Sequence, residues 1–226
     1  MPTDNDIRNP NPQHMHLYLI ELHGPRGVDV IRRHPGVPAI AAYAQTLPEK
    51  VDGFKEALAE LRRLQGVNEK LARESAAQTG DLYVATFTWR SRAQIDLSGF
   101  DAENIAITET RAADVVLVNG SNLIAMLEGR ESEAPYIAEA RAELVAKLSV
   151  TKATFEALRD GRSLVQAKQR EVHALAADVH AQLIGLRRAA RMVLGASHSD
   201  TKMLRIERSR ALAEPPLETD PATPHA

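Results

Sequence analysis

The distribution of proline constrains the fold of this chain more than any other sequence feature. Of the 12 prolines, seven lie in residues 1–48 and four in residues 215–226, which leaves Pro135 alone in residues 49–214. Proline interrupts helices because it lacks a backbone N–H group and its ring clashes with the preceding turn. The middle of the chain can therefore form long helices, with a boundary expected at Pro135.

The composition points to a mainly α-helical fold and excludes several kinds of chemistry. There are 35 alanines and 24 leucines among 226 residues, and both residue types are strong helix formers. The chain has no cysteine, which excludes disulfides, thiolate zinc sites and a cysteine nucleophile. The sequence shows neither a secretion signal nor an apolar run long enough to span a membrane. We therefore expect a soluble, cytoplasmic protein.

Residues 1–47 are expected to form an N-terminal arm that is partly disordered. Within this arm, residues 16–33 contain two apolar runs around the turn-like segment 23–27, a pattern typical of a small β-hairpin. The same apolar residues can instead dock an arm onto the helices, and the sequence leaves both interpretations open. A short helix is expected over residues 38–45, and the Leu-Pro-Glu sequence at 47–49 indicates the start of a longer one.

The spacing of apolar residues predicts a helix over residues 49–78, ended by Gly80 and Asp81. The next segment, residues 81–95, is rich in residues that favour strands, but its apolar side chains also fit one helical face. We predict a helix there because an isolated strand would have no evident partner.

Residues 101–128 also fit two structures. Their apolar spacing is helical, with Asp101 as N-cap and Gly129 as the stop, whereas residues 115–127 resemble a hairpin turning at Asn119-Gly120. We predict the helix.

Residues 134–196 carry the clearest helical pattern of the chain. Apolar side chains recur every three or four residues on both sides of residue 161. Gly161 suits the end of a helix, and Ser163 with Gln166 fits a capping box at the start of another. The apolar stripe nevertheless continues in phase through this point. We predict a helical hairpin, with one continuous helix as the alternative, and Gly195 as the end of the last helix.

These elements together predict an elongated antiparallel bundle of about four main helices. The bundle is expected to occupy residues 48–196, followed by a basic segment and a proline-rich acidic tail over 197–226. Long apolar seams with only nine aromatic residues are typical of helices that pack against one another.

A search for catalytic and cofactor-binding patterns finds no complete motif. The sequence has no Glu-x-x-His pair for a carboxylate-bridged metal bundle, no phosphate-binding glycine loop and no Gly-x-Ser-x-Gly elbow. His173 and His180 share a helix face, but residues seven apart lie about 10 Å apart along the axis and cannot ligate one ion directly. His14, His16 and His23 have no neighbours that fix a metal geometry. We therefore predict no catalytic, cofactor-binding or metal-binding residues.

A basic region near the C-terminus is the one positive functional signal. Residues 162–210 contain ten basic and four acidic side chains. Such a cluster can bind nucleic-acid phosphates, but it also complements helix C-termini and acidic surfaces of a protein partner. Aromatic side chains for base stacking are absent from it. The candidate phosphate or acidic-partner contacts are Arg187, Arg188, Arg191, Arg205, Arg208 and Arg210.

The leading hypothesis is a non-enzymatic structural or assembly protein that self-associates or binds a protein partner through helical faces. The main alternative is a helical protein that associates with nucleic acid through the basic region. A third hypothesis is an enzyme whose residues converge only in the fold, around His173, His180 and the segment 83–89. The sequence identifies neither the partner nor the oligomeric state.

Overall fold

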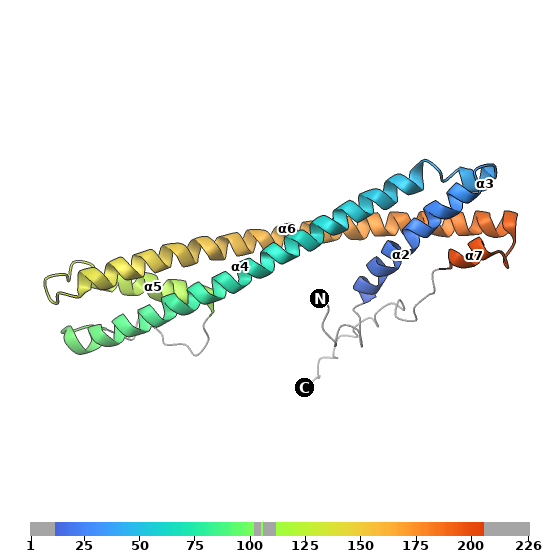
Figure 1. The fold of residues 1–226 in the computed structure, drawn as a ribbon. Helices are drawn as coiled ribbons and strands as arrows, with labels where there is room; N and C mark the ends of the chain where they lie inside the picture. Colours follow the sequence, from blue (N-terminus) through green and yellow to red (C-terminus); the bar gives the residue numbers. More distant parts are fainter. Residues whose placement is uncertain (1–11, 102–104, 106–111, 206–226) are drawn as a thin grey trace, which may run out of the picture. The chain divides into compact units, whose positions relative to one another are not determined.

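Helices account for almost all of the structure that the chain forms (Figure 1). The computed structural model describes residues 12–101, 105 and 112–205. No strand occurs within these residues, which confirms the predicted mainly α-helical bundle. The helices are α2 (Pro12–Arg33), α3 (Pro38–Ala41), α4 (Thr46–Asp96), α5 (Ala113–Leu127), α6 (Ile137–Leu194) and α7 (Ser199–Met203).

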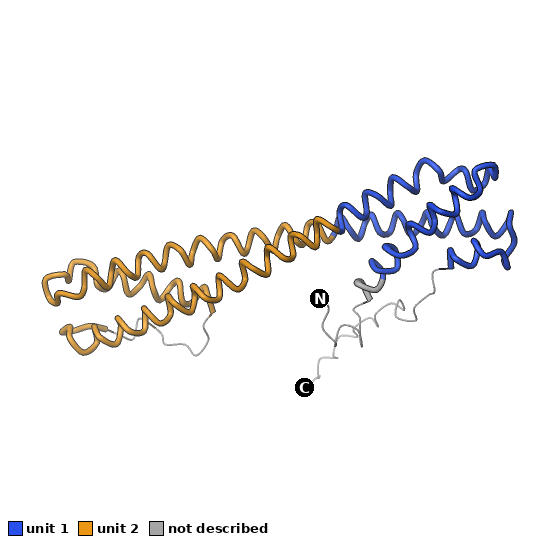
Figure 2. The backbone as a smooth tube through the Cα atoms, viewed as in Figure 1, with its two compact units in different colours: residues 1–58, 170–226 blue, residues 59–169 orange. Residues whose placement is uncertain are grey.

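The chain divides into two compact units (Figure 2). Unit 1 contains residues 1–58 and 170–226, and unit 2 contains residues 59–169. Helices α4 and α6 contribute residues to both units. The domain limits expected at residues 47 and 196 stay predictions.

In unit 1, α2 packs closely against α4 and α6. A β-carbon added to Gly27 of α2 would lie 2.5 Å from Cδ2 of Leu183 and 2.9 Å from Cδ2 of Leu47. Both leucines are buried, so the glycine lets the three backbones approach each other. The largest fully buried side chains of this unit are Ile20, Ile40, Leu47, Phe54, Leu183, Leu186 and Leu204.

The β-hairpin considered for residues 16–33 is wrong, because these residues belong to α2. Pro25 lies inside the helix and cannot donate a backbone hydrogen bond there. Packing against α4 and α6 compensates for this loss, since Leu17, Ile20 and Ile31 bury their side chains in the unit. The local turn signal at residues 23–27 therefore reflects close helix packing. Of the arm expected over 1–47, residues 1–11 lie outside the described residues.

In unit 2, α5 covers one end of the α4–α6 pair. The core of unit 2 contains Leu82 of α4 and Leu97, which directly follows α4. These side chains pack with Leu123 of α5 and Ile137 of α6. The helix predicted for residues 81–95 is confirmed, since these residues belong to α4. Residues 115–127 are also helical, as predicted, and do not form the alternative hairpin. Asp101 is not the N-cap of α5, however, because the helix begins at Ala113 and Ala112 is its N-cap. Of the helix predicted over 101–128, residues 102–104 and 106–111 lie outside the described residues. Gly129, with φ +75°, follows the helix end as predicted.

Trp89 links α4 to α6 within this core. Its Nε1 donates a 2.7 Å hydrogen bond to Glu143, and its ring stacks on Tyr136 with a centroid separation of 5.7 Å. The guanidinium of Arg92 lies 4.1 Å from the Tyr136 ring centroid, which adds a cation–π contact.

The predicted hairpin within residues 134–196 is wrong, because α6 is one helix of 58 residues. Gly161 does not have the positive φ of a helix end; a β-carbon there would lie 2.9 Å from Oδ1 of Asn68 on α4. The glycine allows close helix–helix approach, and Ser163 is an exposed residue within the helix. Helix α4 likewise continues through Gly80 and Asp81. Gly195, with φ +91°, does end α6 as predicted.

Candidate functional site

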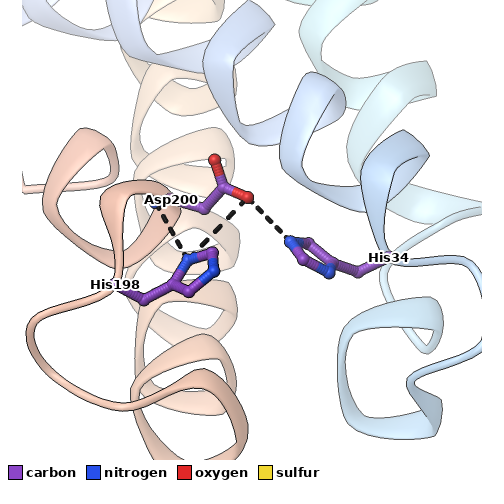
Figure 3. Close-up of side chains that lie close together, drawn as sticks. All are labelled: His34, His198 and Asp200. Atoms are coloured by element: carbon purple, nitrogen blue, oxygen red, sulfur yellow. Dashed lines mark hydrogen bonds and ion pairs between the residues drawn. The ribbon is translucent and has the colours of Figure 1, made fainter.

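Three ionisable side chains from two distant parts of the sequence meet in unit 1 (Figure 3). His34 directly follows the last residue of α2, His198 is the N-cap of α7, and Asp200 lies in the first turn of α7. We call these three residues the His-Asp cluster. One ligand atom from each lies within 4.8 Å of the other two.

Asp200 is at the centre of the cluster and is only 4 % exposed. Its Oδ2 accepts a 2.7 Å hydrogen bond from Nε2 of His34, and its Oδ1 accepts one of 2.7 Å from Nη1 of Arg33. Burial alone would raise the pKa of Asp200, but the hydrogen bond from His34 and the charge of Arg33 hold it below its ordinary value. The carboxylate is therefore ionised at neutral pH.

His198 closes the cluster from the other side. Its Nδ1 accepts a 3.2 Å hydrogen bond from the backbone N–H of Asp200 and lies 4.0 Å from Asp200 Oδ2. The His198 and His34 rings have a centroid separation of 5.7 Å. Two imidazoles and one carboxylate are a donor set that suits borderline divalent metals such as Zn²⁺.

Sequence analysis did not select any residue of the His-Asp cluster. His34 and Asp200 are 166 residues apart, and only packing of α7 beside the end of α2 joins them. The only local signal is the sequence His198-Ser199-Asp200, and serine and aspartate are common at helix starts that bind no metal.

The histidines that sequence analysis considered form a separate group on α2 and α6. The rings of His16 and His180 have a centroid separation of 5.4 Å in an edge-to-face arrangement. Burial, followed by the proximity of His180 and His173, lowers the pKa of His16; burial lowers the pKa of His180. In the described part of the chain, this group does not bring three ligand atoms as close together as the His-Asp cluster does.

The predicted basic contacts lie in unit 1 where the structure describes them. Arg188 and Arg191 are exposed near the end of α6, and Arg187 beside them is half-buried. None of the three forms an ion pair with a carboxylate among the described residues. Arg205 is exposed after α7, and Arg208 and Arg210 lie outside the described residues.

A second candidate surface lies in unit 2, where residues 59–81 of α4 and 149–169 of α6 run as a pair. We call this segment the helix pair. Leu61 and Leu158 are its only buried apolar residues, whereas α5 helps to bury a larger set next to it. Its seam is otherwise polar or half-exposed. The half-exposed apolar residues are Leu64, Leu71, Phe155 and Val165.

Three apolar side chains of the helix pair are more exposed still. Val67 is 47 % exposed, Val150 is 52 % exposed and Leu164 is 59 % exposed. Each directly precedes a residue that faces the other helix of the pair, namely Asn68, Thr151 or Val165. Because the two helices are antiparallel, positions that precede such facing residues lie on the same side of the helix pair. An open hollow of about 220 Å³ lies on this side, lined by Gln78, Asp81, Ala146, Lys147, Val150 and Thr151.

Comparisons with known proteins give no match to any family model, curated protein or solved structure. Among the described residues, no helix is both long enough and apolar enough to cross a membrane.

Proposed function

We propose that this protein is a structural or assembly protein that self-associates through the helix pair of unit 2. The observation that supports the proposal is the exposure of Val67, Val150 and Leu164 beside a seam that buries little apolar surface of its own. Burying apolar surface contributes roughly 25 cal/mol per Å², so covering these side chains would favour association.

A second copy of the same chain is the partner that the surface favours. In a two-fold symmetric contact the same patch meets itself, so it must be self-complementary. The hollow carries Asp81 on α4 and Lys147 on α6, which places both signs of charge on the patch. Unit 2 as a whole has 14 basic and 16 acidic residues, so two copies would repel each other little.

Two helix pairs that meet in this way would form a four-helix arrangement. Residues Leu64, Leu71 and Phe155, now half-exposed, could then contribute to a shared core. This role needs no catalytic group, in keeping with the non-enzymatic function expected from the sequence.

The test is the native mass as a function of concentration, measured by light scattering. We expect a mass near twice the 24.8 kDa of the chain at micromolar concentrations. Val150→Glu should raise the dissociation constant at least about tenfold, because it places a charge in an apolar contact. Val118→Glu is the matched control, since Val118 is 57 % exposed on α5 of the same unit.

The mass measurement can contradict the proposal in two ways. One is a monomer of 24.8 kDa at all concentrations, which would favour a different protein partner. The other is equal weakening by Val150→Glu and Val118→Glu, which would place the contact elsewhere. Circular dichroism of both variants verifies that they keep their helical content.

Association with nucleic acid is the second candidate function, favoured by the arginines of α6 that lack ion pairs among the described residues. A salt-dependent mobility shift that disappears when Arg187, Arg188 and Arg191 are changed to alanine would support it. The cytoplasmic location stays a prediction.

A further inference from the structure

We propose that His34, His198 and Asp200 bind a divalent transition-metal ion, with Zn²⁺ as the probe that best matches their chemistry. Zn²⁺ takes imidazole nitrogen and carboxylate oxygen at about 2.0–2.2 Å, and three protein ligands are sufficient for a site that keeps water as its fourth. This inference concerns unit 1 and does not depend on the proposed self-association.

The distances within the cluster fit one ion. Oδ2 of Asp200 lies 2.7 Å from Nε2 of His34 and 4.0 Å from Nδ1 of His198, and no pair of ligand atoms exceeds 4.8 Å. The three ligand atoms form a triangle with sides of 2.7 Å, 4.0 Å and at most 4.8 Å. A point at equal distance from all three atoms then lies about 2.4 Å or less from each, which is slightly longer than a zinc–ligand bond. A tetrahedral ion with bonds of about 2.1 Å separates its ligand atoms by roughly 3.4 Å. Nε2 of His34 must therefore move away from Oδ2 of Asp200, and Nδ1 of His198 must move toward it, each by more than about half an ångström.

The surroundings orient the carboxylate toward such an ion. Arg33 occupies Oδ1 of Asp200 at 2.7 Å, so Oδ2 is the oxygen directed to the two imidazoles. Partners of this kind fix the orientation of metal ligands and tune their affinity. The side chain of His198 is 38 % exposed, which leaves room for water at a fourth position.

The same surroundings also limit the affinity. The positive charge of Arg33 opposes a cation bound to the same carboxylate. The ion must also replace two hydrogen bonds: the one between His34 and Asp200, and the one that Nδ1 of His198 accepts from the backbone N–H of Asp200. We therefore expect reversible binding, weaker than in a closed site with four protein ligands. Bound metal would fasten α7 to the end of α2, which stabilises unit 1 by linkage.

The competing explanation is that hydrogen bonds alone hold these side chains together to anchor α7. The two explanations differ in a direct measurement on the full chain. Chelator-treated protein is titrated with Zn²⁺ by calorimetry, and its unfolding temperature is measured with and without the ion. Co²⁺ in place of Zn²⁺ gives a visible absorption spectrum that reports nitrogen and oxygen coordination.

Three variants make this experiment specific. His34→Gln and His198→Gln each remove one ligand, while glutamine preserves the size and polarity of the side chain. His180→Gln is the matched control, because it alters the other histidine group of unit 1. We expect one equivalent of Zn²⁺ in the natural protein and in His180→Gln, and at least about 100-fold weaker binding in both other variants.

Several outcomes would overturn the proposal. One is the absence of saturable Zn²⁺ binding in the natural chain. Another is binding that survives both His34→Gln and His198→Gln, or that only His180→Gln abolishes, which would assign the ion to His16 and His180. If one ligand variant fails to fold, the other decides the outcome, because the two substitutions lie on different segments.

Discussion

The rings of His16 and His180 meet edge to face at 5.4 Å between α2 and α6. Burial lowers the pKa of both histidines, and the proximity of His180 and His173 lowers that of His16 further. The folded state therefore favours the neutral form of both rings over the charged form. We therefore expect unit 1 to lose stability in acid.

We expect the free energy of unfolding to decrease as the pH falls below about 6.5, the ordinary pKa of histidine. In that range His16 and His180 bind protons more readily in the unfolded chain than in the folded chain. The free energy of unfolding therefore rises with pH and levels off above about 6.5. Chemical denaturation followed by circular dichroism, with chelator present, measures the effect. His180→Gln should flatten this dependence; an unchanged slope would show that His180 and its neighbour do not cause it.

The close approach at Gly27 predicts a specific loss of stability. Gly27→Ala should lower the free energy of unfolding by about 1–3 kcal/mol, because the new methyl group collides with Leu183 and Leu47 in a packed core. Gly53→Ala is the matched control, since nothing lies within 4 Å of its added β-carbon. That substitution should raise the free energy by about 0.5–1 kcal/mol. Equal effects of the two substitutions in urea unfolding would contradict the packing at Gly27.

The continuity of α6 predicts the effect of Ser163→Ala. If Ser163 capped a new helix, its loss would cost about 1 kcal/mol; inside a continuous helix, alanine is favoured over serine by a few tenths of a kcal/mol. We expect a small gain in the free energy of unfolding. Ser149→Ala, at another exposed position of α6, should give a gain of the same size. A clear loss confined to Ser163→Ala would support a helix boundary there.

Most helices could be predicted from the sequence because they bury one stripe of side chains, and such a stripe leaves a local repeat. The errors occurred at Pro25, Gly80 and Gly161, where local signals usually end helices. Residues distant in sequence contact two of these places: α4 and α6 pack against the α2 helix that contains Pro25, and Asn68 lies beside Gly161. Gly80 has no such neighbour within 4 Å and simply continues a long helix. A single sequence does not contain those contacts.

The His-Asp cluster could not be predicted for a related reason. Neither the residues around His34 nor those around Asp200 form a motif, and the two meet only because α7 returns to the end of α2. The exposed apolar residues of the helix pair were more accessible to prediction, since apolar seams were expected to mediate association. The position of α5 decides which apolar residues of α4 and α6 are buried and which stay exposed. The sequence did not predict that position.

Trp89 is the only tryptophan of the chain, and it stacks on Tyr136 inside unit 2. Its ultraviolet emission therefore reports the state of that unit alone, whereas backbone dichroism averages over every helix. Because α4 and α6 pass from one unit into the other without interruption, coincident transitions in the two signals would mean that both halves melt together. Separate transitions would mean that these long helices can come apart in one half while the other remains folded.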